Sequence, residues 1–325
     1  MLRAGVVGAG VFGGHHASKY VGHPDTGLVT VFDPDQGRAE ALAEKTGCDA
    51  VASFDDLIER VDLLTIASPA DTHANLAKQA IHAGKHVYVE KPLALSTEDA
   101  QSIVKLARAE GVEVFVGHQE RLVLDAVGTF DRIKDPSALE FARCCPPSGR
   151  CEDVSVVWDL MIHDLDIAAK IVGSRAVDID ASGSDHEVSA TVTFANGCRA
   201  SFFASRRSEA AFRKMTATSG ERLTTIDFLA RSLTETYKGD RTVSGFEGAI
   251  ADPVGDNVNA FVQSVLFGRY AEVSRSLYGS VATGVTAADA VQSVSLAENI
   301  EFKRRSQAVL VNDRIDALEQ ERLTA

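Results

Sequence analysis

A lysine is framed in an unusual way in the stretch "HVYVEKPLAL", residues 86–95. A run of strand-forming residues ends in Glu90, Lys91 and Pro92. A surface lysine needs no such framing, whereas a proline fixes the backbone just after Lys91 and so aims its side chain. We therefore interpret Lys91 as a group that reaches a reacting oxygen. The alternative is a solvated lysine at the end of a strand.

A glycine-rich turn near the start of the chain is typical of nucleotide binding. The segment "GAGVFG", residues 8–13, follows an apolar run and precedes a helical pattern. In a G-x-G-x-x-G turn the glycines allow a tight bend and a close approach of the backbone to a pyrophosphate, and the helix N-terminus favours the anion. The alternative is a strand–helix turn without a ligand. The residues expected to contact the cofactor here are Gly8, Gly10, Val11, Phe12 and Gly13.

Asp33 ends the second apolar strand, twenty residues after Gly13. An acid at this place accepts hydrogen bonds from the adenosine ribose hydroxyls and repels a 2′-phosphate. The sequence therefore favours NAD. Arg38 lies close to Asp33 in the sequence and could bind the 2′-phosphate of NADP, so NADP remains an alternative.

Strand and helix patterns alternate through residues 1–116. Continuous apolar strands between helices predict a doubly wound parallel sheet that is covered on both faces, which is the α/β Rossmann arrangement. Ligands of such a sheet lie beyond the carboxyl ends of its strands, so residues that follow the third and fourth strands face the nucleotide. These expected cofactor contacts are Ser68, Pro69, His73, Glu90, Lys91 and Pro92.

The pattern changes after about residue 120, where strands follow one another closely. Residues 187–194 alternate between apolar and polar side chains, and "ANG" at 195–197 is a hairpin signal. This alternation predicts an antiparallel sheet with one covered face. We predict an NAD(P)-binding Rossmann domain over residues 1–120 and an α+β substrate-binding domain over residues 121–325.

Composition and charge narrow the class of partner. The chain has 325 residues and a net charge of −13, without a block of Lys and Arg, which argues against nucleic acid and anionic membranes as partners. No apolar run approaches the ~20 residues of a membrane span. Five cysteines at irregular spacing, without an export signal, indicate reduced thiols in a cytoplasmic protein. The cysteine-rich segment 144–151 lacks an obvious fourth ligand for zinc, so we expect no metal.

Taken together, these residues resemble the Gfo/Idh/MocA oxidoreductase family, named for glucose–fructose oxidoreductase and inositol dehydrogenase. The resemblance implies that Lys91 is catalytic and that the Lys91–Pro92 peptide is cis. It also implies a second domain with a large, mostly antiparallel open sheet used for oligomerisation, hence a homodimer or homotetramer. The matching segments are "GVVGAGVFGGHH", Asp33, "SPADTHANLAKQAIHAGKHVYVEKPLA" and "DLMIHDLDIA".

The family's other catalytic pair is an Asp and a His one helical turn apart, which correspond here to Asp159 and His163. Hydride transfer from a carbinol carbon needs a base for the hydroxyl proton, and imidazole titrates near neutrality. A carboxylate one turn away fixes the tautomer or holds a substrate hydroxyl, and Lys91 polarises the oxygen or relays the proton. Without the family, "DLMIHDLD" would be read as an amphipathic helix with a structural histidine.

Residues around this pair depart from the commonest family pattern. Many members have glycines where this chain has Val156, Val157, Trp158 and Met161. The segments "VGHQERL" and "WDLMIHDLD" are more similar to a subgroup that includes UDP-N-acetylglucosamine 3-dehydrogenase-like proteins. That similarity implies a sugar or nucleotide sugar oxidised at a ring hydroxyl.

Two arginines that follow strands are candidates for binding the substrate. Arg121 and Arg206 present forked donors that suit a phosphate or carboxylate. The alternative for each is a surface arginine in an acidic protein. With Lys91, Asp159 and His163 they complete the expected set of substrate-binding residues.

The resulting prediction is an NAD(P)-dependent dehydrogenase or reductase that acts on a secondary hydroxyl of a sugar, cyclitol or nucleotide sugar. Two other classes remain open. One is a glycoside hydrolase with tightly bound NAD, which would oxidise a sugar transiently. The other is a non-catalytic NAD-sensing protein, although a sensor has no need of Lys91, Asp159 and His163 together.

Overall fold

The chain forms two compact units, each of which is made of two segments. The computed structural model describes residues 1–148, 154–246, 251–267 and 284–324, with side chains described as far as residue 308. The first unit comprises Met1–Val127 and Gly248–Val294, and the second comprises Gly128–Glu247 and Ser295–Ala325. The predicted single boundary after residue 120 did not include this return of the chain to the first unit. Within the described residues, none of the helices is both long and apolar enough to cross a membrane.

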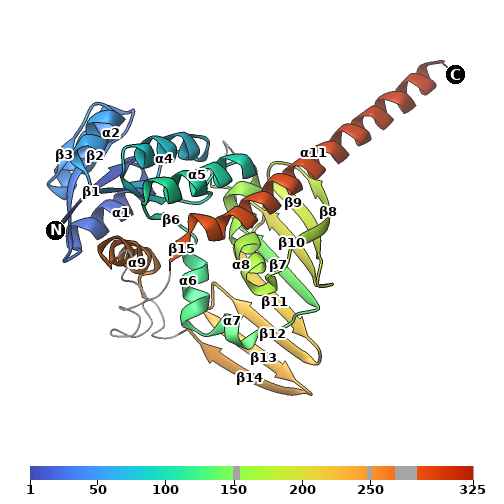
Figure 1. Cartoon of the computed structure of the whole chain (residues 1–325). Coiled ribbons are helices and arrows are strands. Elements are labelled where there is room, and N and C mark those ends of the chain that lie inside the picture. The colour runs from blue at the N-terminus through green and yellow to red at the C-terminus, as the bar shows by residue number, and fades with distance from the viewer. Residues whose placement is uncertain (149–153, 247–250, 268–283, 325) are drawn as a thin grey trace. The chain divides into compact units, whose positions relative to one another are not determined.

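The first unit is built on a seven-stranded sheet in the order β15-β6-β5-β4-β1-β2-β3 (Figure 1). Every pair in it is parallel except β15 with β6, which confirms the predicted parallel Rossmann sheet. Its strands are β1 (Leu2–Val7), β2 (Thr26–Phe32), β3 (Asp49–Ala50), β4 (Leu63–Ile66), β5 (His86–Val89), β6 (Val114–Val116) and β15 (Val285–Thr286).

Helices cover both faces of this sheet. One face carries a core shared by β1, α1, α2 and α9, in which Val6, Tyr20 and Phe261 are fully buried. On the other face Gly5 of β1 lies directly against Leu57 of α3. The helical elements are α1 (Val11–Gly22), α2 (Gln36–Thr46), α3 (Phe54–Arg60), the 3-10 turn η1 (Ala70–Thr72), α4 (His73–His82), α5 (Thr97–Glu110), α6 (Gln119–Ala126) and α9 (Pro253–Phe267).

Short polar signals set the ends of these helices. Ser96 accepts a hydrogen bond from the backbone N–H of Asp99 at 3.1 Å and donates to its carboxylate, and so caps the N-terminus of α5. Gly47 and Gly111 end α2 and α5 in the left-handed region, with φ of +73° and +68°. Non-glycine residues disfavour this conformation, so each glycine stops its helix and returns the chain to the sheet.

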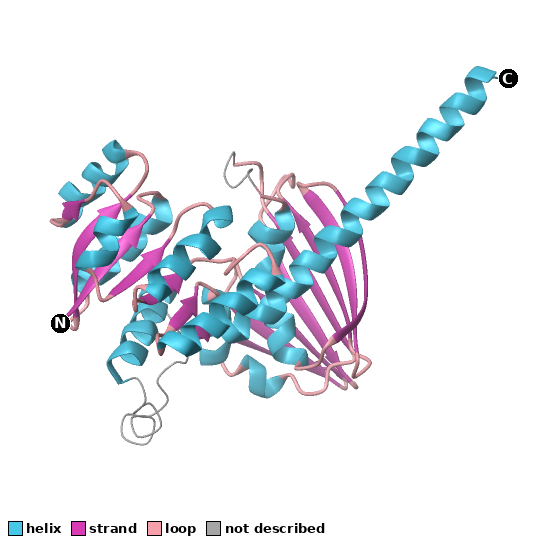
Figure 2. Ribbon diagram, turned by 45° about the horizontal axis from the view of Figure 1, so that its top comes forward, coloured by secondary structure: helices cyan, strands magenta, loops and turns pink. Residues whose placement is uncertain are grey.

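The second unit is built on an eight-stranded sheet in the order β14-β13-β12-β11-β7-β10-β9-β8. Figure 2 shows these strands as one continuous layer. All pairs are antiparallel except β10 with β7, so the expected mostly antiparallel sheet is confirmed. The strands are β7 (Ala138–Cys144), β8 (Ala176–Gly183), β9 (Glu187–Phe194), β10 (Arg199–Ser205), β11 (Phe212–Ser219), β12 (Arg222–Asp227), β13 (Ser232–Tyr237) and β14 (Asp240–Gly245).

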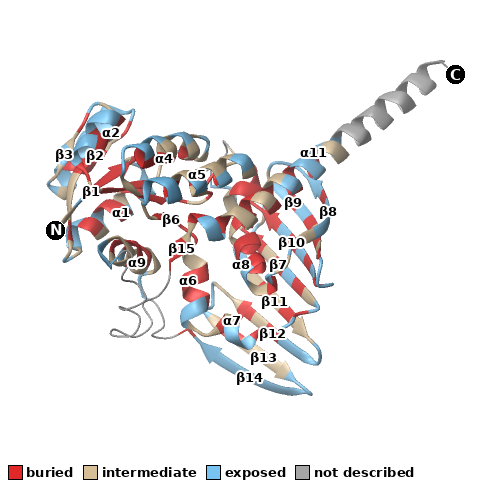
Figure 3. Cartoon of the chain, viewed as in Figure 1, coloured by how far each residue is buried: buried red, intermediate tan, exposed pale blue. Residues whose placement is uncertain are grey.

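One face of this sheet is covered by helix. Val188, Ala190, Val192 and Phe194 of β9 are all buried and the residues between them are more exposed, which confirms the predicted alternation (Figure 3). The rings of Phe141 and Phe202 stack with centroids 5.1 Å apart, because β7 and β10 pair in register. The helical elements are α7 (Thr129–Arg132), the π turn η2 (Val157–Met161), α8 (Ile162–Val172) and α11 (Ala287–Thr324), of which the first eight residues belong to the first unit.

Candidate active site

Three glycines shape the turn between β1 and α1, each for a different reason. Gly8 has φ of +93°, and a Cβ there would lie 2.6 Å from the carbonyl oxygen of Ala67. A Cβ on Gly13 would overlap the carbonyl group of Gly8. Gly10, by contrast, has no atom within 4 Å of its Cβ position. The fold therefore needs glycine at positions 8 and 13, whereas the bare backbone at Gly10 faces open space that a ligand can approach.

The N-terminus of α1 begins at this bare backbone. Gly10 is the N-cap and has no side chain to satisfy the N–H groups of the first turn. Val11 and Phe12 are 59% and 42% exposed, although both are apolar. The N–H groups of the first turn and the positive end of the helix dipole can bind a phosphate. The side chains of Val11 and Phe12 would lie beside the bound group.

Asp33 ties the end of β2 to the same turn. Its side chain is buried, and its two oxygens accept hydrogen bonds from the N–H groups of Ala9 at 2.8 Å and Asp35 at 2.9 Å. An ionised carboxylate has further lone pairs, which are available to ribose hydroxyls. The guanidinium of Arg38 lies 3.3 Å from Asp33 and is largely exposed. Asp33, which favours NAD, and Arg38, which would accommodate NADP, therefore lie beside each other at the end of β2.

His73 joins the loops that follow β4 and β5. Its ring is 1% exposed, with Nδ1 2.7 Å from the carbonyl oxygen of Pro92 and Nε2 2.9 Å from that of Ser68. Burial lowers the pKa of His73 from its ordinary value, while the two carbonyls oppose this change. Because both ring nitrogens face backbone carbonyls, the imidazole fixes the position of these two loops relative to each other.

Glu90 is a buried carboxylate directly beside Lys91. It lies 2.6 Å from Nε2 of His16 and 3.4 Å from the side-chain amide of Gln119. A Cβ on Gly117 would come within 2.6 Å of Glu90, so glycine is needed there to make room. Burial alone would raise the pKa of Glu90, but the hydrogen bond and charge of His16, together with Lys91, bring it below its ordinary value.

Lys91 follows β5 at the carboxyl edge of the parallel sheet. The Lys91–Pro92 peptide is cis, as the family resemblance implied. Lys91 is half-buried and Pro92 is buried. The carbonyl of Pro92 is held by His73, so the backbone on both sides of this peptide is anchored.

Asp159 and His163 lie in the second unit, at the start of the helix that was predicted there. The structure differs from that prediction in one respect: Asp159 lies in the π turn η2, and His163 lies in the first turn of α8. Both residues are half-buried. A π turn inserts an extra residue into a helix, and such turns are frequent at functional sites.

A buried ion pair holds α8 against the sheet. Arg143 of β7 donates to both oxygens of Asp164 at distances from 2.6 to 3.2 Å, and each residue is only 2% exposed. Asp164 directly follows His163 in α8. The pair therefore fixes the rotation of the helix from which the histidine projects.

The two arginines expected to bind substrate are both buried. Arg121 is 8% exposed and lies 3.8 Å from Asp289 near the start of α11. Arg206 is 6% exposed and lies 3.7 Å from Asp159. Neither guanidinium has the exposed position of a surface arginine, so that alternative does not describe them.

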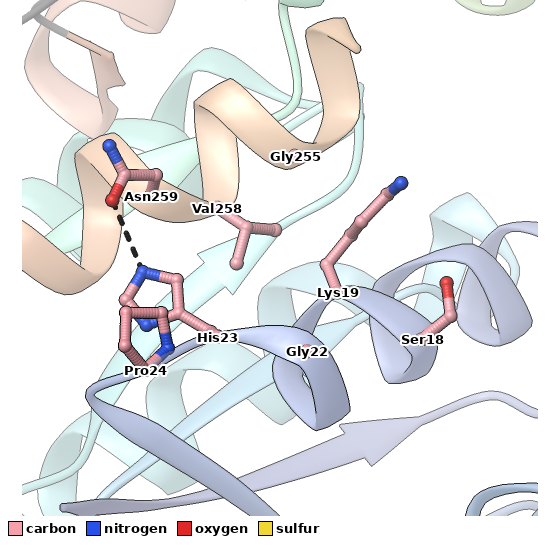
Figure 4. A pocket seen from close by; sticks show the side chains of 8 residues that line it. All are labelled: Ser18, Lys19, Gly22, His23, Pro24, Gly255, Val258 and Asn259. Atoms are coloured by element: carbon pink, nitrogen blue, oxygen red, sulfur yellow. Dashed lines mark hydrogen bonds between the residues drawn. The ribbon is translucent and has the colours of Figure 1, made fainter.

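A surface hollow lies between α1 and α9 (Figure 4). It is formed by the C-terminal end of α1 and by α9, with a volume of about 360 Å³. His23 is bonded to Asn259 across it at 3.1 Å, and Lys19 pairs with Asp252 at 2.6 Å. The hollow lies at the end of α1 opposite to Gly10, so it is not a candidate for the nucleotide.

The structure thus brings the expected cofactor residues together at one edge of the first sheet, and places Asp159, His163 and Arg206 in the second unit. His16 also lies at this edge, although the sequence patterns indicated no role for it in binding or chemistry. It is fully buried against Glu90. Its position three residues after Gly13 and four before Tyr20, on the face of α1 that turns to the sheet, was the available signal.

Comparison with known proteins agrees with this geometry. The model of the Gfo/Idh/MocA oxidoreductase family, NAD-binding Rossmann fold, matches residues 2–118. The UDP-N-acetylglucosamine 3-dehydrogenase of Acidithiobacillus ferrooxidans is 35% identical over 255 residues, covering 76% of this chain and 80% of the relative. The inositol 2-dehydrogenase of Rhizobium meliloti is 29% identical over 204 residues, covering 56% and 58%.

A solved structure of the Acidithiobacillus ferrooxidans enzyme superimposes with a TM-score of 0.83. It is 27% identical in that alignment, which covers 94% of this chain and 98% of the other. Sequence, fold and the placement of the glycine turn and Lys91 lead to one conclusion. The chain belongs to the Gfo/Idh/MocA family of oxidoreductases, in which the N-terminal domain is an NAD-binding Rossmann fold.

Proposed function

We propose that this NAD(P)-dependent oxidoreductase transfers a hydride between the nicotinamide and a secondary ring hydroxyl of a sugar, with a nucleotide sugar as the preferred class. The observation that carries the proposal is the bare backbone at Gly10, on the same edge of the sheet as Asp33 and Lys91. The similarity to a UDP-N-acetylglucosamine 3-dehydrogenase supports the substrate class.

The nucleotide fits the residues of the first unit. The N–H groups at Gly10 and in the first turn of α1 would hold the pyrophosphate, and Asp33 would accept hydrogen bonds from the adenosine ribose. Since a carboxylate repels a 2′-phosphate, we propose NAD as the preferred cofactor. Arg38 is the residue through which NADP would be accommodated. Ser68, Pro69, His73 and Glu90 would support the nicotinamide end, His73 and Glu90 through the loops that they fix.

The bound nicotinamide supplies the acceptor for the hydride that leaves the carbinol carbon. The imidazole of His163 accepts the proton of the hydroxyl group, so that a carbonyl forms as the C–H and O–H bonds break. Asp159 holds a substrate hydroxyl or orients the imidazole. The ammonium of Lys91 donates a hydrogen bond to the reacting oxygen and stabilises the negative charge that develops on it.

The uncovered face of the second sheet supports the proposal of a homodimer or homotetramer. Phe203, Leu223 and Val243 are 37%, 41% and 58% exposed on this face, among polar side chains such as Thr225 and Thr234. A second copy of the sheet would cover these apolar side chains. Light scattering on the purified protein measures the number of subunits, and a monomer at all concentrations would contradict this part of the proposal.

NADH formation tests the function. The purified protein is mixed with NAD and a panel of UDP-sugars, free sugars and inositols, alongside Lys91→Ala and the control Lys105→Ala, which changes an exposed lysine of α5. We expect NADH with UDP-sugars, lost in Lys91→Ala and kept in Lys105→Ala, while both variants still bind NAD. Turnover that survives in Lys91→Ala would overturn the mechanism. No NADH with any substrate, and nucleotide released only on denaturation, would instead indicate the hydrolase with tightly bound NAD.

A further inference from the structure

Arg206 is a buried arginine of the second unit whose guanidinium lies beside the carboxylate of Asp159. Arg206 follows the last residue of β10, and its Nη1 lies 3.7 Å from Oδ2 of Asp159. The side chain of Arg206 is 7% exposed and that of Asp159 13%. A guanidinium stays charged at every accessible pH, and a buried charge is costly unless another charge compensates it. The carboxylate of Asp159 is a compensating charge placed within reach.

The second terminal nitrogen of the same guanidinium, Nη2, forms hydrogen bonds with backbone carbonyls near the start of the π turn η2. Nη2 of Arg206 donates to the carbonyl oxygen of Asp185 at 3.0 Å and to that of Val154. The carbonyl of Asp185 also accepts from the N–H of Val156 at 2.8 Å. Arg206 and Asp185 together therefore fix the backbone on both sides of Ser155.

Ser155 connects this anchored backbone to Asp159. Its carbonyl accepts the N–H of Asp159 at 3.1 Å, and its hydroxyl donates to Glu301 of α11. Glu301 is in turn paired with Arg304 at 2.7 Å. Val154, Ser155 and Val156, which precede η2, are thus each held by a hydrogen bond. Arg206 contacts both this segment and the carboxylate of Asp159.

We propose that Arg206 is a positioning residue, which orients Asp159 for the reaction by holding its carboxylate and the backbone of its turn at the same time. This inference rests on the proposed function of Asp159. Arg206 acts through Asp159 rather than by touching the substrate. A lysine would keep the positive charge but has no planar fork, so it could not contact two carbonyls and a carboxylate in this geometry.

Three variants test this role by turnover. Arg206→Met removes the charge and the donors, Arg206→Lys keeps the charge alone, and Arg207→Met changes the adjacent exposed arginine as the matched control. We expect kcat to fall by about 100-fold in Arg206→Met, the loss typical of a misplaced group, with partial recovery in Arg206→Lys and wild-type turnover in Arg207→Met. The affinity for NAD should not change in any of the three.

A double-mutant cycle separates positioning from a merely structural role. In an Asp159→Asn background, Arg206→Met should cause little further loss, because the residue through which Arg206 acts is already impaired. If Arg206→Met lowers kcat as much in that background as in the wild type, or leaves kcat unchanged in the wild type, the inference is wrong.

Hydrogen exchange provides a readout that does not depend on turnover. The amides of Val156 and Asp159 should exchange faster in Arg206→Met and Arg206→Lys than in the wild type, while the amides of β9 should not. Unchanged exchange at Val156 in both variants would overturn the inference even if the protein oxidises sugars. Faster exchange in a protein that oxidises none of the panel would place the failure in the proposed function instead. Should Arg206→Met not fold, Arg206→Lys alone decides both measurements.

Discussion

Replacing Gly10 with alanine should separate nucleotide binding from folding. The Cβ position of Gly10 has no protein atom within 4 Å, and its backbone, with φ of −75° and ψ of −166°, lies in a region that alanine adopts without strain. Nothing in the protein therefore opposes the methyl group. It would project instead into the space that we assign to the pyrophosphate.

The two effects have opposite signs. Alanine at a compatible glycine position stabilises a protein by about 0.4–1 kcal/mol, because the unfolded chain loses conformational freedom. That gain corresponds to a rise in Tm of roughly 1–4 °C. Displacing the pyrophosphate from one charge-assisted backbone hydrogen bond costs about 1.5–3 kcal/mol. The Kd for NAD should therefore rise roughly 10- to 150-fold.

Differential scanning fluorimetry measures the Tm without nucleotide, and isothermal calorimetry measures the Kd for NAD. Gly13→Ala is the contrasting variant, because its Cβ would overlap the carbonyl of Gly8 and force α1 away from β1. Overpacking of this kind costs about 1–3 kcal/mol, so Gly13→Ala should lower the Tm in the absence of any ligand. Unchanged NAD affinity in Gly10→Ala would refute the assignment of the pyrophosphate to this turn. A lowered Tm in Gly10→Ala would refute the statement that its surroundings are open.

Three further predictions concern charged groups. Asp33→Ser, with Arg38 kept, should raise the affinity for NADPH relative to NADH by at least about 10-fold, since it removes a carboxylate that repels the 2′-phosphate; an unchanged ratio in fluorescence titrations would contradict this. The pKa of Glu90 is lower in the folded protein than in the unfolded chain, so its ionised carboxylate stabilises the fold at pH values above about 4.3, the ordinary pKa of a glutamate. This stabilisation is lost as the pH falls through the lower folded-state pKa. Glu90→Gln should therefore flatten the acid side of a plot of unfolding free energy against pH, measured by urea denaturation, and an equally steep acid side would count against it. Asp164→Ala leaves the buried charge of Arg143 without this partner and should lower the unfolding free energy by about 3–5 kcal/mol; a loss below about 1 kcal/mol would show that the pair is not what fixes α8.

Local patterns were sufficient to predict much of the first sheet. The turn at Gly8, Gly10 and Gly13 depends on backbone geometry within a few residues, and the spacing of the glycines in the sequence indicates that geometry. The alternation in β9 likewise reports which side of a strand is covered. Such signals are local, and so they can be read without knowing the fold.

Partners that are distant in sequence could not be predicted in this way. Glu90 contacts His16, which lies 74 residues away in the sequence. The charged Arg143 lies on the covered face of β7, so this strand does not show the alternation of apolar and polar residues that predicts a strand. The π turn at Asp159 has no distinctive residue signal. The buried positions of Arg121 and Arg206 depend on tertiary contacts with Asp289 and Asp159, so their side chains looked from sequence like those of surface or ligand-binding arginines.

The return of the chain to the first sheet constrains the order in which the protein can fold during synthesis. β15 supplies the last strand beside β6, and Phe261 of α9 packs on Tyr88 and Phe115 with ring centroids 5.9 and 5.5 Å apart. A ribosome that has passed residue 127 must still translate as far as residue 294 to complete this unit, roughly 8–33 s at about 5–20 residues per second. The rings of Tyr88 and Phe115 lack their cover until α9 has been translated, and the edge of β6 lacks its partner until β15 has been translated. Uncovered strand edges are prone to aggregation. The nucleotide, too, gains a complete binding unit only after residue 294 has been translated.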